Sequence, residues 1–344
     1  MKTAQLTDIR TIEINDVPPP TLQHDSDVLL RIKRVGVCGS DIHYFSTGRI
    51  GEQIVDFPFT MGHECAAVVE EVGSEVFSVK PGDRVAVEPA VYCHHCDQCR
   101  SGRKNTCRNL NFLGCPGQLP GALSEYLVMP EESCLRIPDE MSFDAAVVCE
   151  PLAIGLYSAY QAPVVTDAKI GILGAGPVGL SIMLAAQRQG ADKIYVTDKL
   201  DYRVTAAAEH GADAAWNVNE TDVLTTVPDR EPLLLDTVFE CCGQQEAFDQ
   251  AVSLLKPGGT LVLVGIPEFD RYSFQADSAR RKELRFRNIR RQNDCAEDAI
   301  RGTADGSLDT KFMVTHHFKL EETQQAFELV ENYKDGVIKA MVEI

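Results

Sequence analysis

The sequence lacks any uninterrupted apolar run of the roughly 18 residues that a membrane-spanning helix requires. Residues 1–8 contain no apolar segment of the kind found in a secretory signal peptide. Both absences favour a cytoplasmic protein with no membrane partner. Internal repeats and low-complexity segments are also missing, which argues against a repeat architecture.

Basic residues are scarce: 33 Lys and Arg against 51 Asp and Glu give a formal net charge of −18. An acidic surface repels phosphate backbones, so no nucleic-acid partner is expected. Residues 280–291 are a basic exception, and we expect most of them to pair with acids. Binding of an anionic cofactor or an alcohol-bearing substrate is a second interpretation, and nucleic acid is the third. The basic side chains are Arg280, Arg281, Lys282, Arg285, Arg287, Arg290 and Arg291.

A chain of 344 residues exceeds what one hydrophobic core usually supports, so two domains are expected. Its twelve cysteines are not needed as disulfides in a chain of this size. Four of them have metal-ligand spacing: Cys93, Cys96, Cys99 and Cys107. Four thiolates close a tetrahedral shell around Zn²⁺ and leave no open position, which predicts a structural zinc. His94 and His95 could compete as ligands, but we expect them to be solvated.

Gly62-His63-Glu64 places an imidazole beside a carboxylate. Adjacent side chains of a strand point to opposite faces, so both can reach one ligand only from a turn or a strand end. Gly62 supplies the backbone freedom for such a turn. Taken alone, the pair is more simply explained as two solvated side chains. Cys38, in a glycine-lined turn, is either a buried small residue or a thiolate ligand.

Glu150 is a second carboxylate of interest because its neighbours are apolar, and a charged residue there is rarely present for packing. We predict that a helix starts beside it, with Pro151 at the first helical position.

A dinucleotide-binding pattern occupies the middle of the chain. A short apolar strand, 168–173, leads into Gly174-Ala175-Gly176-Pro177-Val178-Gly179 and then a helical pattern. The next strand, 193–197, ends on Asp198, close to the usual spacing of about 20 residues. The glycines let the backbone approach a pyrophosphate at the helix N-terminus. Asp198 would bind the ribose hydroxyls and repel a 2′-phosphate, which favours NAD over NADP.

The alternation continues with strands at 236–240 and 260–265 and a helix at 245–255. These are βαβ units of a parallel sheet. The last fifty residues predict one or two helices and a closing strand, 336–344.

In combination, these motifs resemble the zinc-dependent medium-chain alcohol dehydrogenases. They include the run Cys38-Gly39-Ser40-Asp41-Ile42-His43 and the triplet Glu150-Pro151-Leu152. The resemblance is strongest to the polyol branch, the sorbitol (L-iditol) and xylitol dehydrogenases, and covers essentially the whole chain. That branch uses Glu64 of the His-Glu pair as a ligand, where ethanol-type enzymes use a second cysteine. The cysteine lobe resembles microbial and fungal members with two zincs per subunit.

The resemblance implies an α/β fold in which a Rossmann domain with a doubly wound parallel sheet, 153–290, is inserted in a mostly β GroES-like catalytic domain, 1–152 and 291–344. It also implies a homo-oligomer, either a dimer or a tetramer. The catalytic zinc would be held by Cys38, His63 and Glu64, with water or substrate in the fourth position. Glu150 would be an alternate ligand or a base acting through that water.

The remaining roles also follow from the resemblance. Ser40 and His43 match the proton relay and Tyr44 a substrate-pocket residue, while Arg291 matches the arginine that binds the polyol. Gln292 replaces an aromatic partner and Arg290 a Phe, which leaves the length and stereochemistry of the substrate open. The matching cofactor positions are Gly174, Gly176, Pro177, Val178, Gly179, Asp198, Arg203, Val264, Gly265, Ile266 and Arg290.

The expected reaction is reversible oxidation of a secondary hydroxyl of a sugar alcohol to the ketose, with NAD as hydride acceptor. Two alternatives stay open. A threonine, glucose or butanediol dehydrogenase would share the zinc and NAD residues but differ in the pocket. A non-enzymatic zinc- and nucleotide-binding relative would be expected to lose part of the ligand set, and none of it is missing here.

Overall fold

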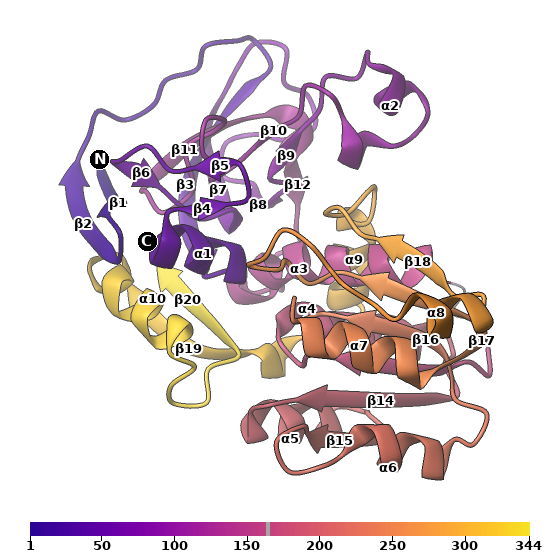
Figure 1. Cartoon of the computed structure of the whole chain (residues 1–344). Coiled ribbons are helices and arrows are strands. Elements are labelled where there is room, and N and C mark those ends of the chain that lie inside the picture. The colour runs from indigo at the N-terminus through magenta and orange to yellow at the C-terminus, as the bar shows by residue number, and fades with distance from the viewer. Residues whose placement is uncertain (163–165) are drawn as a thin grey trace. The chain divides into compact units, whose positions relative to one another are not determined.

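The computed structural model of the protein describes residues 1–162 and 166–344 (Figure 1). Its contacts define two compact units. The first unit comprises Met1–Glu150, Ala296–Gly306 and Thr310–Ile344, and the second comprises Pro151–Cys295 and Ser307–Asp309. The second unit is thus an insertion in the sequence of the first.

The first unit is mostly β. Its main sheet has seven strands in the order β12-β8-β7-β3-β20-β19, with β11 also paired to β3. Smaller sheets have the orders β2-β1-β6, β10-β9 and β4-β5. The strands are β1 (Lys2–Asp8), β2 (Thr11–Asp16), β3 (Asp27–Gly36), β4 (Arg49–Ile50), β5 (Gln53–Ile54), β6 (Phe59–Thr60), β7 (Glu64–Val72), β8 (Arg84–Val87), β9 (Ala90–Val91), β10 (Asn111–Phe112), β11 (Tyr126–Pro130), β12 (Cys134–Arg136), β19 (Val314–Lys319) and β20 (Lys339–Glu343).

Strand β3 shows why this sheet forms. Val28, Leu30 and Ile32 alternate along it and are buried in the core of the unit, as expected for a strand with one face on the core. Strand β20, yellow in Figure 1, pairs antiparallel with β3 through Met341–Gly36 and Val342–Val35. The C-terminal strand therefore reaches the same sheet as β7, which follows the Gly62 turn.

The second unit is built on a six-stranded parallel sheet in the order β15-β14-β13-β16-β17-β18. Strand β13 is central, and its buried apolar residues are typical of a strand covered on both faces. The elements are β13 (Lys169–Leu173), α4 (Pro177–Arg188), β14 (Lys193–Asp198), α5 (Asp201–Glu209), β15 (Ala214–Asn217), α6 (Val223–Arg230), β16 (Leu235–Glu240), α7 (Gln245–Leu254), β17 (Leu255–Leu263), α8 (Ala276–Arg281) and β18 (Arg285–Asn288).

The observed architecture, a parallel α/β unit inserted in a mostly β unit, confirms the predicted fold class. The remaining helices are α1 (Gly39–Thr47), α2 (Asp97–Arg100), α3 (Phe143–Gln161), α9 (Ala296–Ala304) and α10 (Thr323–Glu331), and the 3₁₀ turns are η1 (Lys104–Thr106), η2 (Glu131–Ser133), η3 (Lys311–Met313) and η4 (Leu320–Glu322). Within the ranges that the structure describes, no helix is both long enough and apolar enough to span a bilayer.

The prediction that Pro151 starts a helix is wrong, because α3 already begins at Phe143 and Pro151 lies inside it. The start is fixed upstream, where the Ser142 hydroxyl accepts a hydrogen bond from Ala145 N at 3.1 Å, as an N-cap residue does. An interior proline costs one backbone hydrogen bond. Burial of the flanking Val147 and Leu152 offsets that cost.

Candidate functional site

Cys38, His63 and Glu64 come together in the first unit, each offering a ligand atom within 4.8 Å of the others. Cys38 directly precedes α1. Gly62 has φ of 94°, a conformation that side chains disfavour, and the turn delivers His63 just before the first residue of β7, Glu64. The two adjacent residues therefore serve one centre from the point where the Gly62 turn meets the start of β7.

Asp41 organises this turn from α1. Its Oδ1 lies 3.4 Å from His63 Nδ1, and its Oδ2 accepts a hydrogen bond from Cys38 N at 3.2 Å. Gly62 N donates to Oδ1 at 3.4 Å. A carboxylate on one ring nitrogen fixes the tautomer of a histidine and leaves the other nitrogen for a metal. Asp41 thus connects the backbone at Cys38 with the turn that carries His63.

Lys339 of β20 binds the third donor. Its Nζ donates to Glu64 Oε1 at 2.8 Å and to Glu64 Oε2 at 2.6 Å, and it also lies 3.2 Å from Val37 O. Both side chains are almost fully buried. Gly36 makes room for the carboxylate, since a Cβ at that position would lie 2.4 Å from Glu64 Oε2.

The charges around these donors are strongly coupled. Burial acts to lower the pKa of His63, but the neighbouring Asp41 and Cys38 outweigh it and hold that pKa well above its usual value. Burial likewise acts to lower the pKa of Lys339, whereas Glu64 and Cys38 raise it. Lys339 is therefore a cation, and His63 must release a proton when it binds a metal ion.

Glu150 is a separate acid near this group. Burial raises its pKa to about 8, with further raising by Glu64 and Glu88 and an opposing effect of His63. Its Oε2 is shielded from solvent and accepts no hydrogen bond within the ranges that the structure describes. Glu150 is not in the group whose ligand atoms lie within 4.8 Å, so the structure places it beside the three donors rather than among them.

The predicted relay and pocket residues lie on α1. Ser40 Oγ donates to Cys38 Sγ at 3.3 Å, and His43 is half-buried one turn further along. Tyr44 is buried, with its hydroxyl 3.4 Å from Gln53 Oε1. Phe112 packs against the ring of His63 at a centroid distance of 5.4 Å.

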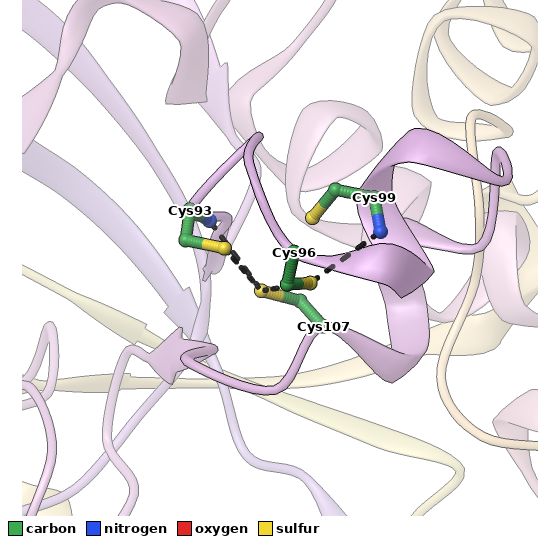
Figure 2. A group of neighbouring side chains, drawn as sticks. All are labelled: Cys93, Cys96, Cys99 and Cys107. Carbon is green, nitrogen blue, oxygen red and sulfur yellow. Dashed lines mark hydrogen bonds between the residues drawn. The ribbon is translucent and has the colours of Figure 1, made fainter.

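The four lobe cysteines form a second cluster, with Sγ atoms all within 4.8 Å of one another (Figure 2). Cys107 Sγ lies 3.4 Å from Cys93 Sγ and 3.9 Å from Cys96 Sγ, and all four residues are free thiols. Burial opposes ionisation, but backbone N–H groups of His95 and Cys96 lower the pKa of Cys93 to about 5. Thiolate character at this position suits a metal ligand.

The two histidines of the lobe are engaged elsewhere. His94 Nε2 pairs with Glu132 at 2.7 Å, and His95 Nδ1 lies 2.6 Å from Cys93 O. This leaves four sulfur donors in the cluster.

The glycine turn of the second unit has no room for side chains. A Cβ on Gly179 would lie 1.9 Å from Gly174 O, and Gly174 itself has φ of 108°. Asp198, at the end of β14, accepts hydrogen bonds from Ala175 N at 2.7 Å and Leu200 N at 3.0 Å. Arg203 lies 4.0 Å from the same carboxylate. Each oxygen of Asp198 keeps a further lone pair for a ribose hydroxyl.

The other predicted cofactor positions also lie in the second unit. Val264 N and Gly265 N donate to Glu240 O at 2.9 and 3.0 Å, and Ile266 is partly exposed after β17. Pro177 and Val178 are the first residues of α4. Helix α4 therefore starts at the glycine turn, where its N-terminus favours an anion.

The basic stretch makes both ion pairs and hydrogen bonds to backbone carbonyls. Arg280 and Arg281 both pair with Asp277, at 2.7 and 2.6 Å. Lys282 instead donates to backbone carbonyls of Val252 and Ser253 at 3.1 and 2.7 Å. Arg290, predicted to contact the cofactor, and Arg291, predicted to bind the polyol, both belong to the second unit.

Gln292, the residue predicted to replace an aromatic substrate contact, also belongs to the second unit. It is buried, and its Oε1 accepts a hydrogen bond from Cys295 N at 2.8 Å. Its amide oxygen is thus engaged with the backbone.

The residues fit the groups that the sequence predicts. One thiol, one imidazole and one carboxylate are typical donors for a zinc ion with an open position, and four thiols are typical of a closed structural zinc. The glycine turn is a cradle that a Cβ would fill, with an acid on the neighbouring strand, as a dinucleotide requires.

Sequence reasoning assigned no role to Lys339 or Asp41. A lysine inside the apolar run Val337-Ile338-Lys339-Ala340-Met341-Val342 was a usable signal, because a buried lysine is almost always paired. Asp41 was visible inside the Cys38 motif, but its contact with His63 depends on the fold.

Two family models match the chain: "Alcohol dehydrogenase GroES-like domain" over residues 24–139 and "Zinc-binding dehydrogenase" over 177–304. A sorbitol dehydrogenase of Bacillus subtilis is 37% identical, with 99% of this chain and 97% of that protein covered. Among solved structures, an oxidoreductase/dehydrogenase of unknown specificity from Escherichia coli is 34% identical, with a TM-score of 0.94 over 100% of this chain and 99% of its own. A zinc-binding dehydrogenase from Sinorhizobium meliloti bound to NADP is 28% identical, with a TM-score of 0.91 over 100% of this chain and 99% of that one.

Proposed function

We propose a function for this chain on the basis of its family, since it belongs to the zinc-binding dehydrogenases with a GroES-like domain. It oxidises a secondary hydroxyl of a sugar alcohol to the ketose, with NAD as hydride acceptor. The observation that carries the polyol assignment is the third donor beside Cys38 and His63, which is the carboxylate of Glu64. The relative named sorbitol dehydrogenase, similar over nearly its full length, supports the same substrate class.

Cys38, His63 and Glu64 would hold the zinc, which supplies a Lewis acid that lowers the pKa of an alcohol. The nicotinamide supplies the hydride acceptor. The contribution of the chain is to place and polarise these groups. Asp41 keeps His63 in one tautomer. Lys339 donates hydrogen bonds to both oxygens of Glu64 and so neutralises part of its charge.

The proton of the hydroxyl must leave the buried site. Ser40 and His43 would pass it outward along α1, or Glu150, which lies beside the three donors, would accept it in its carboxylate form. Tyr44, Arg291 and Gln292 would contact the hydroxyls of the polyol.

Asp198 is the basis for preferring NAD over NADP, because a carboxylate repels a 2′-phosphate. The four-thiol lobe would hold a second, structural zinc, and clustered free thiols suit the cytoplasm, where they stay reduced. We further expect a homo-oligomer, as in the polyol dehydrogenases that the chain resembles.

The test is a substrate panel with the purified full-length protein. Sorbitol, xylitol, butanediol, glucose and threonine are each supplied with NAD⁺ and separately with NADP⁺, and formation of reduced nicotinamide is followed by absorbance. We expect the highest kcat/KM with a polyol and NAD⁺. Highest kcat/KM with threonine, glucose or butanediol would instead assign another reaction of the same family, and no turnover at all would favour a binding protein.

A further inference from the structure

We propose that Lys339 is an internal cation that competes with zinc for Glu64, and that it thereby sets how tightly the metal is held beside Cys38 and His63. The inference rests on the proposed role of Glu64 as a zinc ligand. It assigns Lys339 as a positioning residue that acts through Glu64 and not on the substrate.

The geometry makes this competition direct. The Lys339 ammonium contacts both oxygens of Glu64, at 2.8 and 2.6 Å, and Val37 O at 3.2 Å, so its three protons each have an acceptor. A carboxylate offers about four lone-pair positions, and Lys339 takes one on each oxygen. A metal ion can use a remaining lone pair, but it then shares the negative charge with Lys339.

Burial makes the competition strong. The side chains of Lys339 and Glu64 are 2% and 1% exposed, so water screens neither their attraction nor the repulsion between the ammonium and a divalent ion. No other Lys or Arg is within 4.0 Å of Glu64 among the described ion pairs. Without Lys339, the buried carboxylate of Glu64 would lose the only basic side chain that is hydrogen-bonded to it among the described residues.

The consequence differs between the two forms of the protein. In the zinc-free form Lys339 stabilises Glu64 in place of the metal, whereas in the zinc-bound form the ammonium and the metal repel each other. Removing the charge should therefore destabilise the zinc-free protein more than the zinc-bound protein. By linkage, the same change makes zinc bind more tightly.

The experiment follows transfer of zinc from the loaded full-length protein to the colorimetric chelator 4-(2-pyridylazo)resorcinol. The Lys339→Met variant keeps the apolar stem and loses the charge, and Lys339→Arg keeps the charge. The release phase of the Cys38 site is identified as the one absent from a His63→Ala variant. We expect release from Lys339→Met to be slower than wild type by on the order of tenfold, which corresponds to about 1.4 kcal/mol of repulsion removed from the zinc-bound form. Release from Lys339→Arg should stay close to wild type.

Release from Lys339→Met at the wild-type rate or faster would overturn the inference while leaving the zinc site intact. Absence of that zinc from the wild-type protein would overturn the ligand assignment itself, so the two failures are distinguishable.

Thermal unfolding of zinc-stripped protein gives a second measurement. It remains informative if the Lys339→Met variant is unstable, because it compares the loss of Tm in two backgrounds. Lys339→Met should lower Tm strongly when Glu64 is present and much less when combined with Glu64→Gln, because the neutral amide needs no counter-charge. Equal losses of Tm in both backgrounds would show that Lys339 acts only through packing, and would overturn the proposal.

Discussion

The carboxylate of Asp41 lies 3.4 Å from Nδ1 of His63, and its side chain is 1% exposed. The same carboxylate accepts hydrogen bonds from Cys38 N and Gly62 N. One side chain on α1 therefore holds the imidazole and the two backbone segments that present the proposed zinc ligands. A ligand histidine supported in this way loses little conformational entropy when the metal binds.

Asp41→Asn should weaken zinc binding at the Cys38 site by about 10–100-fold, the usual range for loss of a second-shell carboxylate. The amide can donate to Nδ1 as well as accept, so the ring tautomer is no longer fixed. Competition titration with a chelator measures the affinity. Asp56→Asn, at an exposed position of the same unit, is the matched control and should keep wild-type affinity. An unchanged affinity in Asp41→Asn would contradict the role given to this carboxylate.

Cys99→Ser should remove the zinc of the lobe and leave the other zinc in place. The four sulfur atoms lie within 4.8 Å of one another, so loss of one thiol opens the shell. Metal analysis should show a fall from about two zincs per chain to about one, and Tm should fall because structural zinc contributes to folding. Cys242→Ser, an exposed thiol outside both clusters, should keep both metals. Retention of two zincs in Cys99→Ser would rule out the lobe assignment.

Asp198→Ser should raise KM for NAD⁺ about tenfold to a hundredfold, since hydrogen bonds to a charged group contribute about 1.5–3 kcal/mol. It should also reduce the preference for NAD⁺ over NADP⁺, because the charge that repels a 2′-phosphate is gone. Steady-state kinetics with both cofactors measures the change. Asp192→Asn, exposed just before β14, serves as control. If the NAD⁺/NADP⁺ ratio stayed constant in Asp198→Ser, this carboxylate would not be the selecting group.

Glu231 gives a prediction for acid stability. Burial acts to raise its pKa, but hydrogen bonds from Lys169 and Tyr195 lower the pKa below the ordinary 4.5, and the Tyr195 hydroxyl lies 2.5 Å from Oε1. An acid with a lowered folded-state pKa stabilises the protein above its unfolded-state pKa, and this stability is lost as pH falls through the folded-state value.

Glu231→Gln should therefore lower the free energy of unfolding by about 1.5–3 kcal/mol at neutral pH. Its stability should also depend less on pH below about 4.5 than that of the wild type. Urea unfolding at a series of pH values measures both effects. Glu220→Gln, exposed in the same unit, should change neither. A pH dependence in Glu231→Gln equal to that of the wild type would contradict this account.

Much of the fold can be predicted from the sequence because short motifs determine it. The glycine turn between 173 and 180 and the acid that ends β14 predict a parallel dinucleotide-binding unit, and the chain indeed forms one from β13 through β18. The family prediction is confirmed by both domain models and by relatives similar over nearly the full chain. The start of α3 was misplaced because Ser142, a common helix cap, is a weaker signal than the proline within the helix.

The supporting residues of the site could not be derived in the same way. Lys339 lies 275 residues from Glu64 in the chain, and only the pairing of β20 with β3, beside β7, brings them together. A local sequence pattern cannot predict a contact between residues so far apart in the chain. The apolar neighbours of Lys339 thus predict that it has a partner, but the fold was needed to identify Glu64.

Glu64→Gln tests the central assignment most directly. It keeps the shape of the side chain and removes the anionic donor, while Glu71→Gln, exposed on the same strand, is the control. The decisive measurement is zinc content together with kcat/KM for the best polyol of the panel, on the same preparation. We predict that zinc at the Cys38 site and turnover fall together in Glu64→Gln, and that both stay at wild-type values in Glu71→Gln. Full zinc occupancy with full activity in Glu64→Gln would contradict the assignment of this carboxylate as a ligand.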